Sequence, residues 1–153
     1  MVARMKIVSI AVSKKKGTQK TPVAEAFLSK DHGLSGDAHA GPWHRQVSFL
    51  SSESIDLARE QGLDVGFGDF AENIATVGID WKTLPIGTRV RLGERAVVEI
   101  TQIGKECQNR CAIYYKAGDC IMPREGVFAR VLEEGAIRCN DPIEIIGAPA
   151  TSA

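Results

Sequence analysis

The hydrophobic and polar positions of this chain follow short, strand-length patterns over most of its length. Apolar residues, many of them Val or Ile, recur or alternate in segments 5–12, 45–50, 86–92, 96–103 and 142–146. Short segments of this kind, bounded by glycine, proline or charged residues, are typical of β-strands. Two further segments, 23–28 and 126–134, carry apolar residues at spacings that fit either a strand or a helix. We therefore expect a chain built mainly of short strands.

One helix is predicted over residues 52–61. Ser51 or Ser52 can cap its N-terminus by accepting a hydrogen bond from a backbone N–H, and Gly62 can end it. Its apolar face is expected to contain Ile55, Leu57 and Ala58.

Three segments are predicted to be loops. Residues 33–42 and 66–73 are rich in glycine, which weakens regular structure, and such loops often carry functional side chains. The lysine-rich segment 14–21 is expected to be an exposed loop. Together these patterns predict a mainly β fold, a small barrel-like or sandwich arrangement with a few short peripheral helices. We expect one domain over residues 1–147 and a flexible C-terminal tail over 148–153.

The length and charge of the chain narrow the classes of function. A chain of 153 residues can bury about two-thirds of its unfolded surface in one domain without disulfides. Its 19 basic and 19 acidic residues cancel, so no global field attracts nucleic acid or an anionic membrane. The N-terminal apolar run is too short for a secretory signal, and no segment approaches the roughly 20 apolar residues of a membrane span. We expect a cytoplasmic protein, in which cysteines are more often thiols or metal ligands than disulfides.

Most of the cysteines lie in one basic segment. Three of the four cysteines fall within 14 positions and are interleaved with three cationic residues: Cys107, Cys111, Cys120, Lys105, Arg110 and Arg124. A nearby cation lowers the pKa of a thiol and makes the reactive thiolate more abundant. Cys107, which lies between Lys105 and Arg110, is therefore the strongest candidate for a nucleophile, and Cys111 and Cys120 are weaker ones.

Two other roles for these thiols remain open. Any one of them could be a buried free cysteine, and this interpretation fits Cys139 best. Four thiols could also bind one zinc ion, but only Cys107 and Cys111 have the close spacing of a structural zinc site. We therefore predict a fold that needs no metal.

Three arginines are candidates for holding an anionic ligand. Arg45, Arg124 and Arg130 could each grip a phosphate or carboxylate through the planar guanidinium fork, or could form ordinary surface ion pairs. The chain contains neither G-x4-G-K-[ST] nor G-x-G-x-x-G. The absence of both motifs argues against nucleotide-driven chemistry.

The glycine-rich loops contribute further candidates. Asp37 and Asn73 could orient a ligand or cap turns, and His39 could fix its loop by hydrogen bonding or join a metal site. Trp43 and Trp81 could stack on a pterin ring, or could be core or lid residues. We include Asp37, His39 and Asn73 in the predicted ligand-binding set with Arg45, Lys105, Arg110 and Arg124.

Three ordered blocks of the sequence match the pattern of a known family. They are Gly36-Asp37-x-His39-x-Gly41 with Arg45-Gln46-Val47, Gly68-x-Phe70-x-Glu72-Asn73-Ile74, and the cysteine segment followed by Gly126-x-Phe128-Ala129-Arg130-Val131. Through these blocks, residues 5–147 resemble the MOSC domain family, the domains related to the C-terminal part of molybdenum cofactor sulfurase, and its small stand-alone bacterial members in particular. The resemblance implies a β-rich, barrel-like fold that works without pyridoxal phosphate. It also implies a role in sulfur transfer or in handling the molybdenum cofactor or its pterin precursor.

The resemblance places the sulfur-carrying cysteine at Cys107. The implied partners are a small-molecule or protein sulfur donor and proteins of molybdenum cofactor biosynthesis or molybdoenzymes, with no nucleic acid and no membrane. Two interpretations stay open. The domain is either a sulfur transferase that acts through a persulfide on Cys107, or a non-catalytic module that binds the cofactor or its precursor.

The sequence departs from the family pattern in two places. Gln108 stands after the cysteine, where similar sequences often have a histidine, and a glutamine side chain cannot act as a base. Asn140-Asp141 stands where the family usually has Gly-Asp before the last strand. Because asparagine tolerates the left-handed conformation, we expect this turn to form as it does in the family.

Overall fold

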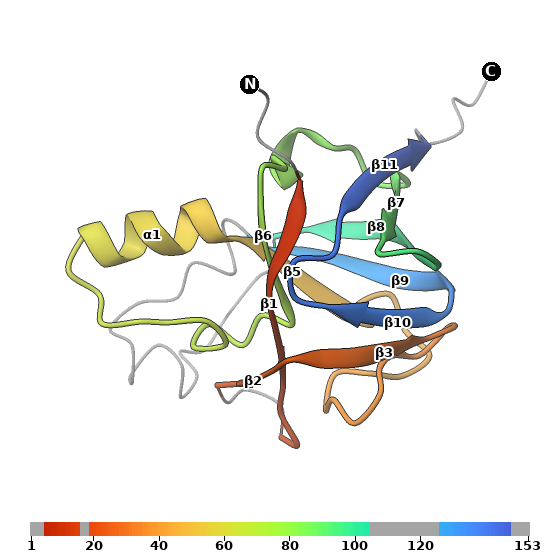
Figure 1. The fold of residues 1–153 in the computed structure, drawn as a ribbon, viewed down its shortest axis with the longest axis horizontal. Coiled ribbons are helices and arrows are strands. Elements are labelled where there is room, and N and C mark those ends of the chain that lie inside the picture. The colour runs from red at the N-terminus through yellow and green to blue at the C-terminus, as the bar shows by residue number, and fades with distance from the viewer. Residues whose placement is uncertain (1–4, 16–18, 105–125, 148–153) are drawn as a thin grey trace.

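The computed structural model describes residues 5–15, 19–104 and 126–147, and these residues form a mainly β structure (Figure 1). The described part of the chain contains eleven strands, one α-helix and one 3-10 helix. In chain order they are β1 (Lys6–Val12), β2 (Thr21–Val23), β3 (Glu25–Ser29), β4 (Gly33–Leu34), β5 (Val47–Ser51), α1 (Ser52–Glu60), β6 (Ile74–Val77), the 3-10 helix η1 (Trp81–Thr83), β7 (Arg89–Leu92), β8 (Ala96–Ile103), β9 (Val127–Glu133), β10 (Gly135–Arg138) and β11 (Ile143–Gly147). The prediction of a mainly β fold with little helix is confirmed.

The strands form two sheets. The larger sheet has eight strands in the order β11-β7-β8-β9-β5-β6-β1-β2, and the smaller has three in the order β10-β3-β4. Strands β5 and β6 run parallel, and α1 makes the crossover connection between them. A parallel pair needs such a crossover, because a tight hairpin turn joins only antiparallel strands.

The larger sheet curls until β1 meets the chain just before β11. Lys6 forms a bridge with Pro142, and the backbone N–H of Ile7 donates to the Asp141 oxygen at 2.9 Å. Strand β1 uses its other half, from Ile10 onward, to pair with β2. Since β1 divides its length between two neighbours, the described strands form a barrel-like but open sheet.

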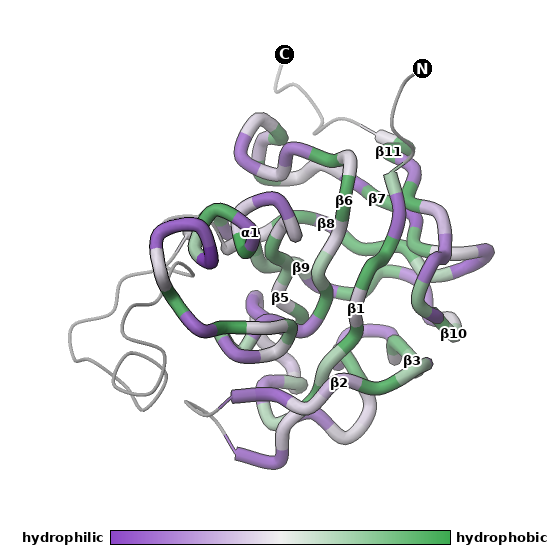
Figure 2. Tube along the Cα trace, turned by 60° about the vertical axis from the view of Figure 1, so that its left-hand side comes forward, coloured by the Kyte–Doolittle hydropathy of each residue, from purple (hydrophilic) through white to green (hydrophobic). Residues whose placement is uncertain are grey.

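A hydrophobic core fills the space between the two sheets. Figure 2 shows hydrophobic positions gathered along the central strands and hydrophilic positions in the outer loops. Trp81 is 2% exposed and lies with its ring centroid 4.6 Å from that of Phe49. Its indole N–H donates to Thr76 Oγ1 at 2.7 Å, which satisfies the polar atom that this ring carries into the core. Trp81 is therefore a core residue.

The helix α1 forms where the sequence predicts it. Ser51 is the N-cap, and its side chain accepts a hydrogen bond from the Ser54 N–H. Ile55 and Ala58 are buried against a second, smaller core cluster. The prediction for Leu57 is wrong, because its side chain is 58% exposed. Residues three apart share a helix face, whereas residue 57 points away from the face shared by residues 55 and 58.

Both segments of ambiguous pattern are strands. Segment 126–134 forms β9, and segment 23–28 contains the end of β2 and most of β3. Strand β10, which begins at Gly135, has no counterpart in the sequence prediction. A Cβ atom at position 135 would lie 2.8 Å from the Ala96 nitrogen, so glycine permits this strand to pass close to β8.

Two loop predictions have different outcomes. Asn140 has a φ of 74°, the left-handed conformation expected for the turn before the last strand. Lys20 does not lie in an exposed loop as predicted, because its side chain is 0% exposed. No helix in the described part of the chain is long and apolar enough to cross a membrane.

Candidate functional site

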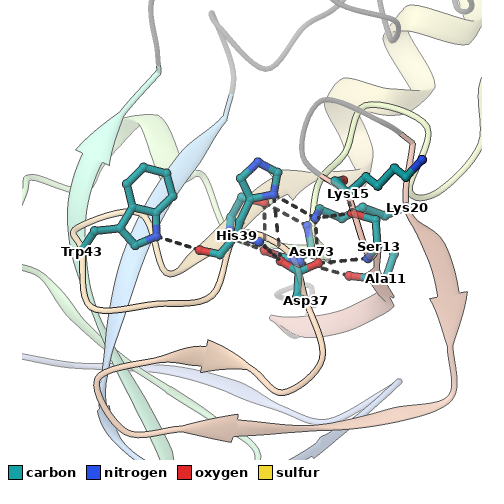
Figure 3. Close-up of polar contacts among 9 residues, drawn as sticks. Ala11, Ser13, Lys15, Lys20, Asp37, His39, Trp43 and Asn73 are labelled. Atoms are coloured by element: carbon teal, nitrogen blue, oxygen red, sulfur yellow. Dashed lines mark hydrogen bonds and ion pairs between the residues drawn. The ribbon is translucent and has the colours of Figure 1, made fainter.

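A buried polar cluster lies where the two glycine-rich loops meet the end of β1 (Figure 3). We use "the polar cluster" for five residues: Ser13, Lys20, Asp37, His39 and Asn73. Ser13 follows β1, Lys20 precedes β2, Asp37 and His39 lie in the loop between β4 and β5, and Asn73 precedes β6. The five residues of the polar cluster thus come from segments that lie apart in the sequence.

The centre of the cluster is an ion pair between Lys20 and Asp37. The Lys20 ammonium lies 2.7 Å from Asp37 Oδ1, and both side chains are 0% exposed. The backbone N–H of Ser13 donates to Oδ1 at 3.0 Å, and that of His39 donates to Oδ2 at 3.1 Å. Burial by itself raises the pKa of Asp37, but the hydrogen bond and charge of Lys20 outweigh it and hold this pKa below its usual value. Asp37 is therefore a carboxylate at neutral pH.

The cluster reaches the surface at His39. Lys20 Nζ also lies 3.1 Å from Ser13 Oγ and 3.1 Å from His39 Nδ1. The His39 side chain is 27% exposed, whereas those of Lys20 and Asp37 are 0% exposed. The indole N–H of Trp43 donates to the His39 carbonyl oxygen at 2.7 Å and holds this part of the loop in place.

The Asn73 side chain bonds its loop to strands β5 and β1 of the larger sheet. Its Oδ1 accepts hydrogen bonds from the backbone N–H of Ser48 at 3.0 Å and from the Ser48 hydroxyl at 3.2 Å. Its Nδ2 donates to the Ala11 carbonyl oxygen at 3.1 Å, and its side chain helps to lower the pKa of Asp37. Asn73 is 1% exposed, so it supports Asp37 from the interior.

The second glycine-rich loop packs on the backbone of Lys20. The Lys20 N–H donates to the Gly68 carbonyl oxygen at 2.8 Å, and Gly68 has a φ of +85°. Glu72, which is 1% exposed, accepts hydrogen bonds from the backbone N–H groups of Gly68 at 2.7 Å and Phe70 at 3.3 Å. Burial raises the pKa of Glu72 to about 7, against the lowering effect of these N–H donors.

The raised pKa of Glu72 predicts a pH dependence of stability. Between the unfolded value of 4.5 and about 7, the unfolded chain releases this proton and the folded chain keeps it. The free energy of unfolding should therefore fall by about 3 kcal/mol as the pH rises through this window, and then level off. We expect Glu72→Gln to abolish this decline in urea unfolding measured from pH 4.5 to 8. An equal slope in the variant would show that Glu72 ionises normally.

Arg45 lies in the same loop as Asp37 and His39, and its guanidinium lies near two aromatic rings. Its Cζ is 4.6 Å from the Trp43 ring centroid and 5.6 Å from that of Phe128. Its Nε is buried, and no acceptor in the described residues lies within hydrogen-bond distance of it. Because a buried N–H without an acceptor is costly, by about 1–3 kcal/mol, this position suits an arginine that receives a ligand.

The loop that carries Arg45 is bonded to the end of β8. His44 Nε2 lies 2.8 Å from Gln102 Oε1, and the Gln102 side-chain amide donates to the Gly104 oxygen at 2.7 Å. Gly104 in turn donates its N–H to the Gly126 oxygen at 2.6 Å. Gly104 and Gly126 are the described residues that flank segment 105–125. The candidates Cys107, Lys105, Arg110 and Arg124 lie in that segment, outside the described residues, as do Cys111 and Cys120.

The structure therefore brings together three of the predicted ligand-binding residues, Asp37, His39 and Asn73. Arg130 instead forms a surface ion pair with Glu99 at 3.2 Å. Sequence reasoning missed Lys20, since nothing in a lysine-rich loop marks one lysine as buried. Within residues 5–15, 19–104 and 126–147, no three His, Cys, Asp or Glu side chains are placed to hold a metal ion. Cys139 is a half-buried free thiol beside the Val23 oxygen.

Comparison with known proteins agrees with this fold. The family model for the MOSC domain matches residues 36–144, which include the glycine-rich loop 66–73 and most of the loop 33–42. A search of the curated proteins found no match.

Solved structures with the same fold come from small bacterial proteins. YiiM from Geobacillus stearothermophilus is 24% identical with a TM-score of 0.72, and the match covers 94% of this chain and 75% of that one. The YuaD protein from Bacillus subtilis is 17% identical with a TM-score of 0.75, over 92% and 94% of the two chains. YiiM from Escherichia coli is 22% identical with a TM-score of 0.65, over 93% and 70%. These structural likenesses concern the fold, whereas the family match covers most of the sequence, and the chain accordingly belongs to the MOSC domain family.

Proposed function

We propose that this domain carries or transfers sulfur in the handling of the molybdenum cofactor or its pterin precursor, with Cys107 as the sulfur-carrying thiolate. The observation that supports it most is the arrangement around His39 and Arg45. A buried ion pair anchors His39 from within, and Arg45, in the same loop, has a buried N–H without an acceptor among the described residues. The same loop is bonded through His44 and Gln102 to the base of the segment that carries Cys107.

The proposed chemistry is an exchange of sulfane sulfur. The Cys107 thiolate attacks the terminal sulfur of a donor persulfide, R–S–SH, and forms a new S–S bond. The bond between the two donor sulfurs breaks, and the donor leaves as a thiolate, R–S⁻. Cys107 then holds the persulfide Cys–S–SH, and an acceptor nucleophile takes its outer sulfur by the same type of step. Lys105 and Arg110 would favour the thiolate form that both steps need.

The second candidate function is a non-catalytic module that binds the molybdenum cofactor or its precursor. Gln108 favours it, since glutamine cannot supply the base that a histidine beside Cys107 would provide. In this case Arg45, Arg124 and His39 would hold an anionic ligand, and the cysteine would be a ligand or a bystander. Mass spectrometry of ligands that co-purify with the intact chain separates the two functions, together with the thiol chemistry below.

Cys107 is expected to be the most reactive thiol of the chain. Brief treatment with iodoacetamide at pH 7, followed by peptide mapping, should show modification at Cys107 first. Cys139 is a matched internal control, because its thiol is half-buried and packs against the core. Incubation with a small persulfide donor should then add the mass of one sulfur atom to the parent chain and none to Cys107→Ser. Faster alkylation of Cys139, or equal sulfur loading of the variant, would refute the sulfur-carrier function.

A further inference from the structure

The imidazole of His39 has one nitrogen inside the polar cluster and one that points away from it. Nδ1 lies 3.1 Å from Lys20 Nζ, and the side chain is 27% exposed. Figure 3 shows the other ring nitrogen, Nε2, directed away from Asp37 and Lys20. The position of the proton on this ring therefore decides whether Nε2 is a hydrogen-bond donor or an acceptor.

The protonation of Lys20 follows from its ion pair with Asp37. Both side chains are fully buried, with 2.7 Å between Nζ and Oδ1. Two backbone N–H groups, those of Ser13 and His39, also donate to this carboxylate, so it is held as an anion. A buried anion needs a cation to compensate it, and Lys20 is that cation. An ammonium group can only donate hydrogen bonds.

Since Lys20 donates, His39 Nδ1 must accept. A neutral imidazole has one donor and one acceptor nitrogen, so the proton lies on Nε2. We propose that Lys20 is a positioning residue that holds His39 as the Nε2–H tautomer and so makes the open end of the polar cluster a hydrogen-bond donor. Nothing in the family match or in the sequence pattern assigns a role to Lys20.

Asp37 on its own would favour the opposite tautomer. Its Oδ2 lies 4.0 Å from His39 Nδ1, close enough to attract a proton onto that nitrogen. The Lys20 ammonium opposes this attraction, because its Nζ is nearer to Nδ1, at 3.1 Å, and donates a hydrogen bond to it. Lys20 thus determines which nitrogen of His39 carries the proton, and Asp37 holds Lys20 in place.

The inference also defines the class of ligand, and in this part it rests on the proposed function. The oxygens of Asp37 accept from Lys20, Ser13 and the His39 backbone, so the carboxylate faces inward. His39 Nε2, the ring nitrogen directed away from Asp37 and Lys20, is then an N–H donor. Donors of this kind suit an anionic, acceptor-rich group such as a phosphate or a thiolate, and not a metal cation or an amine.

Nitrogen-15 NMR of the intact chain tests the tautomer directly. Long-range proton–nitrogen correlations of the imidazole rings at pH 7.5 should show His39 with an unprotonated Nδ1 and a protonated Nε2. The exposed His32 and the Gln102-bonded His44 serve as internal references in the same spectrum. A proton on Nδ1 of His39, alone or together with one on Nε2, would overturn the proposal.

Replacement of Lys20 gives a variant whose His39 ring pattern can be compared with that of the parent. In Lys20→Met, Asp37 should draw the proton of His39 onto Nδ1, and an unchanged ring pattern in the folded variant contradicts the role of Lys20. If this variant does not fold, the double variant Lys20→Met with Asp37→Asn removes both charges together. There the ring of His39 should approach the averaged pattern of His32, and a pattern equal to that of the parent again contradicts the role.

Titration with inorganic phosphate then separates this inference from the proposed function. Phosphate should shift the Nε2 proton of His39 in the parent chain, and His39→Ala should weaken phosphate binding about tenfold or more. An intact Nε2–H tautomer that does not respond to phosphate supports the role of Lys20 and refutes the anion site. A phosphate response without the Nε2–H tautomer supports the anion site and refutes the role of Lys20.

Discussion

Replacing Lys20 with methionine is expected to lower the free energy of unfolding by about 3–5 kcal/mol, because it leaves the buried Asp37 carboxylate without its cation. Both side chains of the pair are 0% exposed, so water cannot compensate the charge that remains. Urea unfolding at pH 7, followed by tryptophan fluorescence, measures the change, since Trp81 lies in the core.

Two controls accompany this measurement. Arg91 forms an ion pair with Glu144 at 3.1 Å, but the side chains are 40% and 66% exposed, so Arg91→Met should cost under about 1 kcal/mol. The pH supplies the other control. The pKa of Asp37 in the parent lies below its usual value, so the stability that the pair contributes is lost as the pH falls through it. The difference between parent and Lys20→Met should therefore shrink toward acid pH, and a loss of the same size at every pH would point to packing instead.

Replacing Gly68 with alanine is expected to destabilise the fold by about 2–5 kcal/mol. Gly68 has a φ of +85°, and a left-handed conformation costs an alanine about 1–2 kcal/mol. In addition, a Cβ atom at this position would overlap the Lys20 carbonyl oxygen, and overpacking of this kind costs about 1–3 kcal/mol more. Since the clash is with Lys20 itself, the variant should also disturb the His39 ring signals.

Gly36 provides a matched control for this substitution. It has the same φ of +85°, but a Cβ atom there would meet nothing within 4 Å. Gly36→Ala should therefore show only the cost of the backbone conformation, about 1–2 kcal/mol. Equal losses of stability in the two alanine variants would mean that the loop moves away from Lys20 without penalty.

Local patterns in the sequence predict most of the secondary structure. The helix begins after Ser51, one of the two serines that the sequence offers as N-cap, and Asn140 adopts the left-handed turn expected of it. These features depend on neighbouring residues, which is why they can be read along the chain. Strand β10 was missed because a glycine normally marks an end, whereas Gly135 begins a strand that passes close to β8.

The candidate site shows the limit of such patterns. Asp37, His39 and Asn73 were identified because they lie in glycine-rich blocks typical of the MOSC domain family. Asn73 also makes contacts that no local pattern contains, since it bonds Ala11 across 62 positions and Ser48 across 25. The structure also places Arg45 near the rings of Trp43 and Phe128 and leaves its buried Nε without an acceptor among the described residues.

By itself, then, the sequence determined the alternation that makes this chain mainly β, the ends of its helix and the loops that belong to its family. Only the tertiary structure decided which of its many charged residues would be buried. Lys20 lies in a lysine-rich segment whose composition predicts exposure, yet its side chain is enclosed because Asp37, 17 positions away, supplies the opposite charge. Gly68, farther along the chain, lets a second loop close over its backbone. Burial of a charge depends on groups brought together by folding, and no local pattern of hydrophobic and polar residues contains that information.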